Sequence, residues 1–189
     1  MCSAIWPETT KPVEQPVNWK LLQTIIILPG TALVFIPLTI VWLTSASRWA
    51  AAWSGTGTAS FWIGVLLLCA GLTLAGWTVT LFMRFGQGTP APWDPPKKLV
   101  IRGPYRYVRN PMITSVLVML LAEALLFRSW PLAVWLISFF LINAIYFPLV
   151  EEKGLEKRFG GDYLTYKGHV PRWFPRMTPW VLPPENHEH

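Results

Sequence analysis

Long apolar runs alternate with polar segments along this chain of 189 residues. Four apolar runs stand out, at residues 21–44, 61–82, 112–127 and 131–150. A membrane-spanning helix needs roughly 20 apolar residues, and all of these runs except the third reach that length. Only Arg128, Ser129 and Trp130 separate the third run from the fourth, which predicts an antiparallel helical hairpin. The pattern therefore predicts an all-α, multi-pass transmembrane helical bundle of about four spans.

The composition agrees with a membrane protein. Hydrophobic residues make up 52% of the chain and charged residues only 14%, whereas a soluble domain carries about 25% charged residues. The net charge of +6 could indicate nucleic-acid binding. However, the basic residues lie between apolar runs, so we expect them to contact membrane lipids and to orient the chain rather than to bind nucleic acid.

The basic residues are distributed unevenly over the predicted loops. If the N-terminus is cytoplasmic, all of the 16 Lys and Arg residues except Arg48 and Arg128 lie on the cytoplasmic side. The positive-inside rule then places both termini and the central loop in the cytoplasm. Residues 1–20 are polar and contain prolines, so they are interpreted as a cytoplasmic tail and not as a signal peptide. The compact size fits a bacterial inner membrane.

Two polar segments frame the predicted hairpin. Before it lies Gly103-Pro104-Tyr105-Arg106-Tyr107-Val108-Arg109-Asn110-Pro111, and after it comes Glu151-Glu152. A cytoplasmic helix is expected from Glu151 to about Arg158, ended by Gly160-Gly161, with a short helix after it. Both segments should lie at the same membrane face, because an antiparallel hairpin returns the chain to its starting side.

These two motifs, with their order and spacing, resemble the isoprenylcysteine carboxyl methyltransferase and phospholipid methyltransferase superfamily. The second motif continues through Leu155, Phe159-Gly160, Tyr163, Tyr166 and Val170-Pro171. The resemblance covers about residues 86–175. It divides the chain into a tail (1–20), two transmembrane helices (21–82) and a methyltransferase core (83–189).

The resemblance implies a membrane-embedded methyltransferase that uses S-adenosylmethionine and acts on a small or lipophilic methyl acceptor, with a cofactor pocket open to the cytosol. Cationic and amino groups of the cofactor favour carboxylates and aromatic faces, and its carboxylate favours an arginine. The cofactor-binding residues it implies are Tyr105, Tyr107, Arg109, Asn110, Pro111, Glu151, Glu152 and Tyr163. The catalytic candidates are His169, Arg172 and Tyr166. His169 titrates near neutrality and could accept a proton from the acceptor, while Arg172 could bind an anion.

The motif departs from the superfamily at two of these positions. Asn110 stands where a histidine is usual, so hydrogen bonding is kept but proton transfer is not. His169 stands where the prenylcysteine enzymes have an arginine, which argues against a prenylcysteine carboxylate as substrate. A phospholipid N-methyltransferase and a non-catalytic, lipid-binding scaffold of the same fold are the alternatives.

Several of the singled-out residues also have simpler interpretations. Arg109 could reach lipid headgroups, and the tyrosines could anchor the chain at the membrane surface. Glu123, the one acid within a span, could reach water or pair with Arg128. Cys2 and Cys69 predict no disulfide, and His187 and His189 are too few to predict a metal site.

Overall fold

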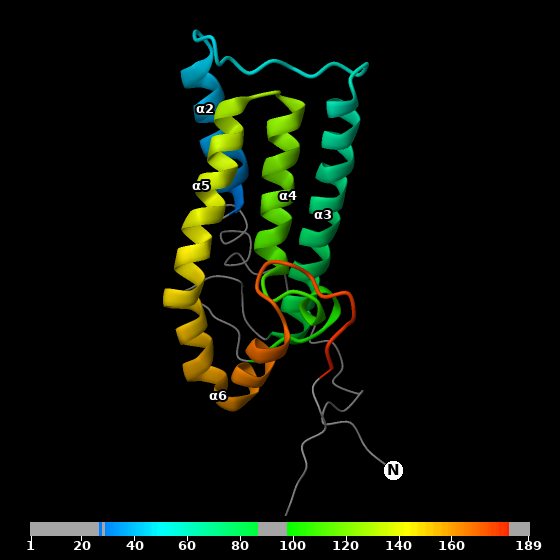
Figure 1. Cartoon of the computed structure of the whole chain (residues 1–189), viewed down its shortest axis with the longest axis vertical. Helices are drawn as coiled ribbons and strands as arrows, with labels where there is room; N and C mark the ends of the chain where they lie inside the picture. Colours follow the sequence, from blue (N-terminus) through cyan, green and yellow to red (C-terminus); the bar gives the residue numbers. More distant parts are fainter. Residues whose placement is uncertain (1–26, 28, 87–97, 182–189) are drawn as a thin grey trace, which may run out of the picture.

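In a computed structural model, the chain forms a helical bundle that carries its polar segments at one end (Figure 1). The structure describes residue 27 and residues 29–86 and 98–181. Within these residues every regular element is a helix, which confirms the all-α fold class. The N-terminal tail, much of the central loop and His187 and His189 lie outside the described part.

The first apolar run forms a π-helical turn, η1 (Thr31–Phe35), that continues directly into α2 (Ile36–Thr44). Pro37 lies in the first turn of α2, where a missing backbone N–H is harmless. The widened turn just before it relieves the clash between the proline ring and the preceding carbonyls. The irregularity that Pro37 introduces into this run is thus taken up by η1.

The longest helix, α3 (Ala59–Phe85), packs against α4 (Pro111–Leu126) through glycine contacts. A Cβ atom added at Gly71 would lie 2.5 Å from Met119 Cγ, and one added at Gly64 would lie 2.7 Å from Leu126 Cγ. Only glycine allows the two helix backbones to come this close. Gly64 and Gly71 therefore permit the close packing of α3 on α4.

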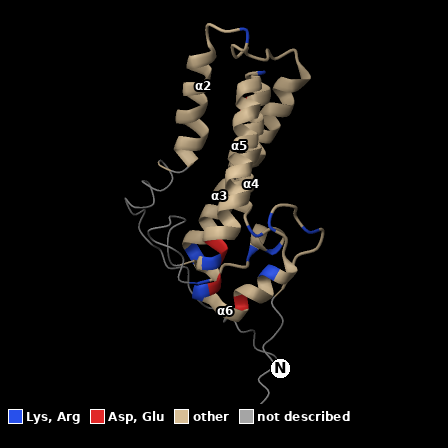
Figure 2. Ribbon diagram, turned by 60° about the vertical axis from the view of Figure 1, so that its left-hand side comes forward, with Lys and Arg blue, Asp and Glu red and all other residues tan. Residues whose placement is uncertain are grey.

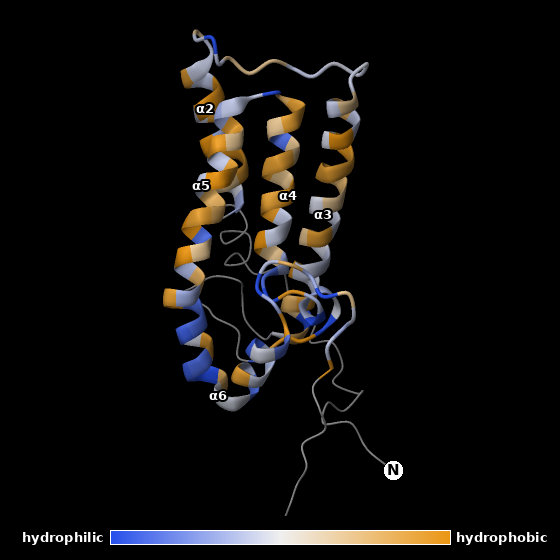
Figure 3. Ribbon diagram, viewed as in Figure 1, coloured by the Kyte–Doolittle hydropathy of each residue, from blue (hydrophilic) through white to orange (hydrophobic). Residues whose placement is uncertain are grey.

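A tight turn joins α4 to α5 (Trp130–Tyr146), as the hairpin prediction required. Arg128 in this turn has a positive φ of 42°. The core between the helices is formed by Ala32, Val116, Met119 and Leu120. Large apolar side chains on α2, α3 and α5 face outward instead, and Figure 3 shows these outer faces as predominantly hydrophobic. An outward-facing apolar surface of this extent is typical of helices that contact lipid.

Two helices are long and apolar enough to cross a membrane. They are α3 and the continuous helix that begins at Trp130 and runs on to His169. The helices Thr31–Thr44 and Pro111–Leu126 are shorter. The structure therefore supports two of the predicted spans by length and composition, and the count of four stays a prediction.

The chain does not begin a new helix at Glu151, so that expected boundary was wrong. Instead α5 runs through the π-helical turn η3 (Phe147–Glu151) into α6 (Glu152–His169). The expected break does occur at Gly160, whose backbone leaves the helical region at φ 51° and ψ −127°. The change from apolar to polar residues near Glu151 marks the expected membrane surface and not a helix end.

The charged side chains gather at the end of the bundle that carries α6 (Figure 2). The loop between α2 and α3 and the turn between α4 and α5 lie at the opposite end (Figure 1). This distribution agrees with the uneven distribution of basic residues over the predicted loops. The assignment of the charged end to the cytoplasm stays a prediction.

Candidate functional site

Three segments meet at the charged end of the bundle. The first runs from the 3-10 helix η2 (Gly103–Arg106) to Asn110, just before α4, and the second is α6. The third, residues 170–181, follows α6 and is called the strap below. Gly103 fixes the first segment against α3, because its φ is +53° and an added Cβ would lie 2.7 Å from Leu81 Cδ1. Both the backbone conformation and the close approach require glycine there.

Backbone hydrogen bonds tie the strap to the segment that precedes α4. Arg109 N donates to Pro171 O at 2.9 Å, and Arg176 N donates to Tyr107 O at 2.9 Å. Trp180 N donates to Arg106 O at 3.0 Å, and the Arg106 side chain returns a 2.9 Å bond from Nε to Trp180 O. The strap is thereby held in register beside Arg109, and this register carries Arg172 to the site.

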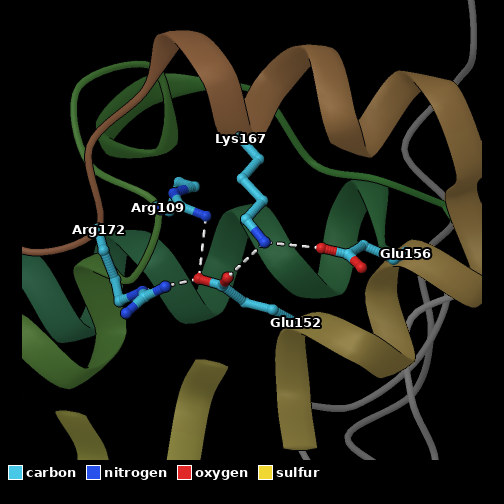
Figure 4. Close-up of polar contacts among 5 residues, drawn as sticks. All are labelled: Arg109, Glu152, Glu156, Lys167 and Arg172. Carbon is cyan, nitrogen blue, oxygen red and sulfur yellow. Dashed lines mark hydrogen bonds and ion pairs between the residues drawn. The ribbon is translucent and has the colours of Figure 1, made fainter. Parts of the chain in front are cut away.

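One buried carboxylate, that of Glu152, collects three cations from these segments (Figure 4). Its Oε1 accepts hydrogen bonds from Arg109 Nη1 at 2.9 Å and Arg172 Nε at 2.7 Å. Lys167 Nζ lies 3.1 Å from Oε2 and also donates to Glu156 Oε1 at 2.7 Å. Only 4% of the Glu152 side chain is exposed. A charge this deeply buried is tolerated because it is paired and hydrogen-bonded.

The cations determine the ionisation of this carboxylate. Burial acts to raise the pKa of Glu152, but the hydrogen bond from Arg172, the charge of Arg109 and the ion pair with Lys167 outweigh it. The net pKa lies below the ordinary value of a glutamate, so Glu152 is ionised at neutral pH. The pKa of Lys167 is raised in turn by its hydrogen bond to Glu156 and its ion pair with Glu152.

Three buried polar atoms in this cluster have no hydrogen-bond partner. They are Arg109 Nε, Asn110 Nδ2 and Glu152 Oε2, the last of which is in ion-pair range of Lys167 but not aligned for a hydrogen bond. Buried polar groups in native proteins are nearly always paired, so orphaned ones require an explanation such as a bound ligand. Two donors beside one acceptor suit a zwitterion, with a carboxylate for the donors and an ammonium group for Glu152.

The predicted tyrosines form the wall behind this cluster. Tyr105, Tyr163 and Tyr166 are buried, and Tyr166 Oη donates to the carbonyl oxygen of Tyr105 at 2.6 Å. Burial raises the pKa of all three phenols, and the charge of Glu152 adds to the effect at Tyr163. The phenols therefore stay neutral. Tyr107 is half-buried, and its carbonyl accepts a hydrogen bond from the strap.

His169 lies at the end of α6 and apart from the ion cluster. Its ring stacks on Trp180 with centroids 5.5 Å apart, and its Nδ1 lies 2.8 Å from Thr165 O. The side chain is exposed, and none of its contacts involves Arg109, Glu152 or Arg172. The sequence prediction of a proton-accepting role for His169 therefore has no contact with the cluster to support it.

The remaining predicted residues are placed as follows. Pro111 is fully buried and starts α4, as expected. Glu151 is half-buried at the end of η3 and takes no part in the contacts of Glu152, consistent with separate roles for adjacent helix residues. Glu123 lies on α4 with its Oε2 buried and unpartnered. No ion pair joins Glu123 to Arg128 among the described residues, which does not support the second of its two simpler interpretations.

Sequence reasoning missed two residues of this site. Lys167 was counted only as a cytoplasmic charge, although it bridges Glu152 and Glu156. Trp180 contributes to the cluster that buries Tyr163, Tyr166 and Val170. The spacing of Glu156 and Lys167 gave no signal, because they meet only through the non-helical turn at Gly160.

The family model described as phospholipid methyltransferase matches residues 59–162 of the chain. The match extends from the start of α3 into α6 and includes Arg109, Asn110 and Glu152. No curated protein matched the chain. The match, together with two helices long and apolar enough to cross a membrane, indicates a membrane-associated methyltransferase family. The chain belongs to the phospholipid methyltransferase family, which confirms the superfamily resemblance of the sequence.

Proposed function

We propose that the chain is an integral membrane methyltransferase that takes its methyl group from S-adenosylmethionine at the Glu152 cluster. The observation that carries this proposal is the set of orphaned atoms, Arg109 Nε, Asn110 Nδ2 and Glu152 Oε2. They offer two donors and one acceptor to a ligand within the segment that the family model matches. The amino-acid end of S-adenosylmethionine carries the complementary carboxylate and ammonium groups.

The residues would hold the cofactor rather than react with it. Arg109 and Asn110 would bind the carboxylate, and Glu152 would bind the ammonium group beside it. The bound cofactor supplies an electrophilic methyl group, whose transfer depends on alignment and on exclusion of water. The neutral tyrosine wall behind the cluster contributes the dry surface that such a transfer requires.

The methyl acceptor is a small or lipophilic molecule that reaches the site from the membrane side. The description of the matching family favours the phospholipid amine, the alternative weighed from the sequence. For an amine acceptor, a proton must leave the nitrogen, and His169 would need to turn away from Trp180 to receive it. Tyr166 would likewise have to release the Tyr105 carbonyl before it contacted an acceptor. Arg172, already on Glu152, is better placed to orient an anionic headgroup.

The cofactor assignment is tested by calorimetry with S-adenosylmethionine on the purified, detergent-solubilised protein. Asn110→Ala is the sharpest variant, because the amide nitrogen has no partner in the structure and its loss leaves the ion cluster intact. Loss of a hydrogen bond to a charged group should weaken binding by about 1.5–3 kcal/mol. Arg102→Ala is the control, since Arg102 is an exposed cation at the same end that stacks on Phe85.

Two results would contradict parts of the proposal. Equal affinity of Asn110→Ala and the unmodified protein would remove Asn110 from the cofactor site. Absence of any binding heat at saturating cofactor would favour the non-catalytic scaffold. Transfer of a labelled methyl group to lipid, prenylcysteine, thiol or amine pools then identifies the acceptor class.

A further inference from the structure

The strap exposes large apolar side chains at the charged end of the molecule. Phe174 is 82% exposed, Met177 is 97% exposed and Val181 is 63% exposed. Exposed apolar groups that follow one another along a short segment mark an interaction surface. Arg172 precedes these residues and Arg176 lies between Phe174 and Met177 in sequence, so the strap combines apolar and cationic groups.

The depth of the strap relative to the bundle follows from helix lengths. Trp130 is exposed at the start of α5, beside the turn at the end opposite α6, a position typical of membrane-interface aromatics. Phe140 and Phe147 lie ten and seventeen residues further on, about 15 and 26 Å along a helix that rises 1.5 Å per residue. Both positions fall within a hydrocarbon layer that is roughly 30 Å thick.

Trp173 of the strap packs against both of these residues. Its ring centroid lies 5.3 Å from that of Phe140 and 6.0 Å from that of Phe147, in edge-to-face contacts. The strap therefore touches α5 and η3 at a level that the bilayer should cover. Phe174, the next residue, is exposed.

The short helix α4 leaves space for the strap within the thickness of the bilayer. Its 16 residues make about 24 Å, roughly 6 Å less than the hydrocarbon thickness. The last residue of α4 is joined to α5 by a tight turn at one membrane surface. The helix therefore falls short of the opposite surface at its first residue. At that first turn the strap is fastened by the hydrogen bond from Arg109 N to Pro171 O. Figure 1 shows the strap, orange to red, crossing the bundle beside this end of α3 and α4, with the bend of α6 further out.

We propose that the strap is a membrane-surface element that inserts Phe174 and Met177 into the boundary between lipid headgroups and acyl chains. The apolar side chains continue the lipid-facing surface of the helices. Arg176, between Phe174 and Met177 in sequence, and Arg106, bonded to Trp180 of the strap, donate to carbonyl oxygens rather than to carboxylates of the described chain, so their charges complement anionic headgroups. The occupant of this surface is the bilayer itself, and the inference stands independently of methyl transfer.

The test places an environment-sensitive fluorophore on single cysteines in lipid nanodiscs that contain anionic phospholipid. Cys2 is first replaced by Ser and Cys69 by Ala. The probe positions are Met177→Cys and, as a second strap position, Phe174→Cys. The controls are Leu66→Cys, exposed on the apolar face of α3, and Asp162→Cys, exposed on α6. Lipids with a nitroxide near the headgroup or deep in the acyl chain serve as quenchers.

The expected result is strong quenching of both strap probes by the shallow nitroxide and weak quenching by the deep one. Leu66 should show the reverse order, and Asp162 should be quenched by neither. Strap probes that behave like Asp162 while Leu66 is quenched would overturn the proposal but leave membrane insertion intact. A blue-shifted strap probe that neither nitroxide quenches would also overturn it, since another protein would then cover the strap. An unquenched Leu66 would contradict membrane insertion itself, and the proposal with it.

Discussion

Replacing Glu152 by glutamine should strongly destabilise the protein, because it removes one charge that three cations share. Gln keeps the size of the side chain and one carbonyl oxygen, so the lost quantity is charge and not packing. Arg109 and Arg172, whose side chains are 10% and 24% exposed, would be left without their carboxylate. Breaking a buried ion pair in this way costs about 3–5 kcal/mol. We expect the lower end of this range, because Arg172 retains some contact with water.

Glu156→Gln is the matched control for this substitution. Glu156 pairs with the same Lys167, but both side chains are about one-third exposed, at 33% and 36%. Exposed ion pairs contribute about 0–1 kcal/mol, so the control should change the free energy of unfolding by less than 1 kcal/mol. Equilibrium unfolding in mixed detergent micelles, followed by circular dichroism, measures both variants under identical conditions. Equal effects of the two substitutions would refute the view that Glu152 is the centre of the cluster.

The pH dependence of the free energy of unfolding provides a second test of the role of Glu152. The pKa of Glu152 in the folded protein lies below its unfolded value, which is near 4.5. The stabilisation is therefore fully present above the unfolded pKa and is lost as the pH falls through the folded pKa. The difference in unfolding free energy between the unmodified protein and Glu152→Gln should be constant near neutrality and shrink in acid. A difference that stays constant at acid pH would mean that ionisation of Glu152 is not its source.

Three further substitutions test the packing. Gly71→Ala should lower the free energy of unfolding by about 1–3 kcal/mol, because the added methyl group overpacks against α4. Gly76→Ala, with open space around its Cβ, should leave it unchanged. Unfolding in detergent compares the two variants, and equal stability would contradict the close helix contact. Gly160→Ala should lower the free energy of unfolding by about 1–3 kcal/mol, because Gly160 has a positive φ that alanine rarely adopts. Gly161→Ala should leave the free energy of unfolding unchanged in the same assay. Tyr166→Phe should lose about 1 kcal/mol with its buried hydrogen bond, and an unchanged melting temperature would argue against that bond.

The sequence predicted the helices well because apolar runs reflect burial or lipid contact directly. The hairpin expected at residues 112–150 corresponds closely to α4 and α5. Helix ends were less predictable. The apolar run that gave α3 stops near Phe82, but the helix continues to Phe85, because an arginine ends hydrophobicity without ending helical backbone. For the same reason Glu151 was mistaken for a helix start.

The candidate site was predicted in part. The two motifs singled out Arg109 and Glu152, and the structure joins them by a 2.9 Å hydrogen bond across 43 residues of sequence. The contribution of Lys167 could not be anticipated, since it depends on one backbone conformation at Gly160. Arg172 was proposed as an anion-binding group, whereas the described structure shows it bound to Glu152. The partners of Lys167 and Arg172 depend on the path that the chain follows after α6 bends, and a sequence motif contains no information about that path.

The strap has a consequence for the order in which the protein is assembled. Its contacts are distant in sequence, with Arg106 bonded to Trp180 across 74 residues. Helices α3 and α5, which are long and apolar enough to cross a membrane, can enter it as their residues leave the ribosome, but the ion cluster cannot close until residue 172 has been made. Insertion and site formation are thus separate events. Chains truncated after α6 would enter the membrane and still lack the cation that Arg172 brings to Glu152.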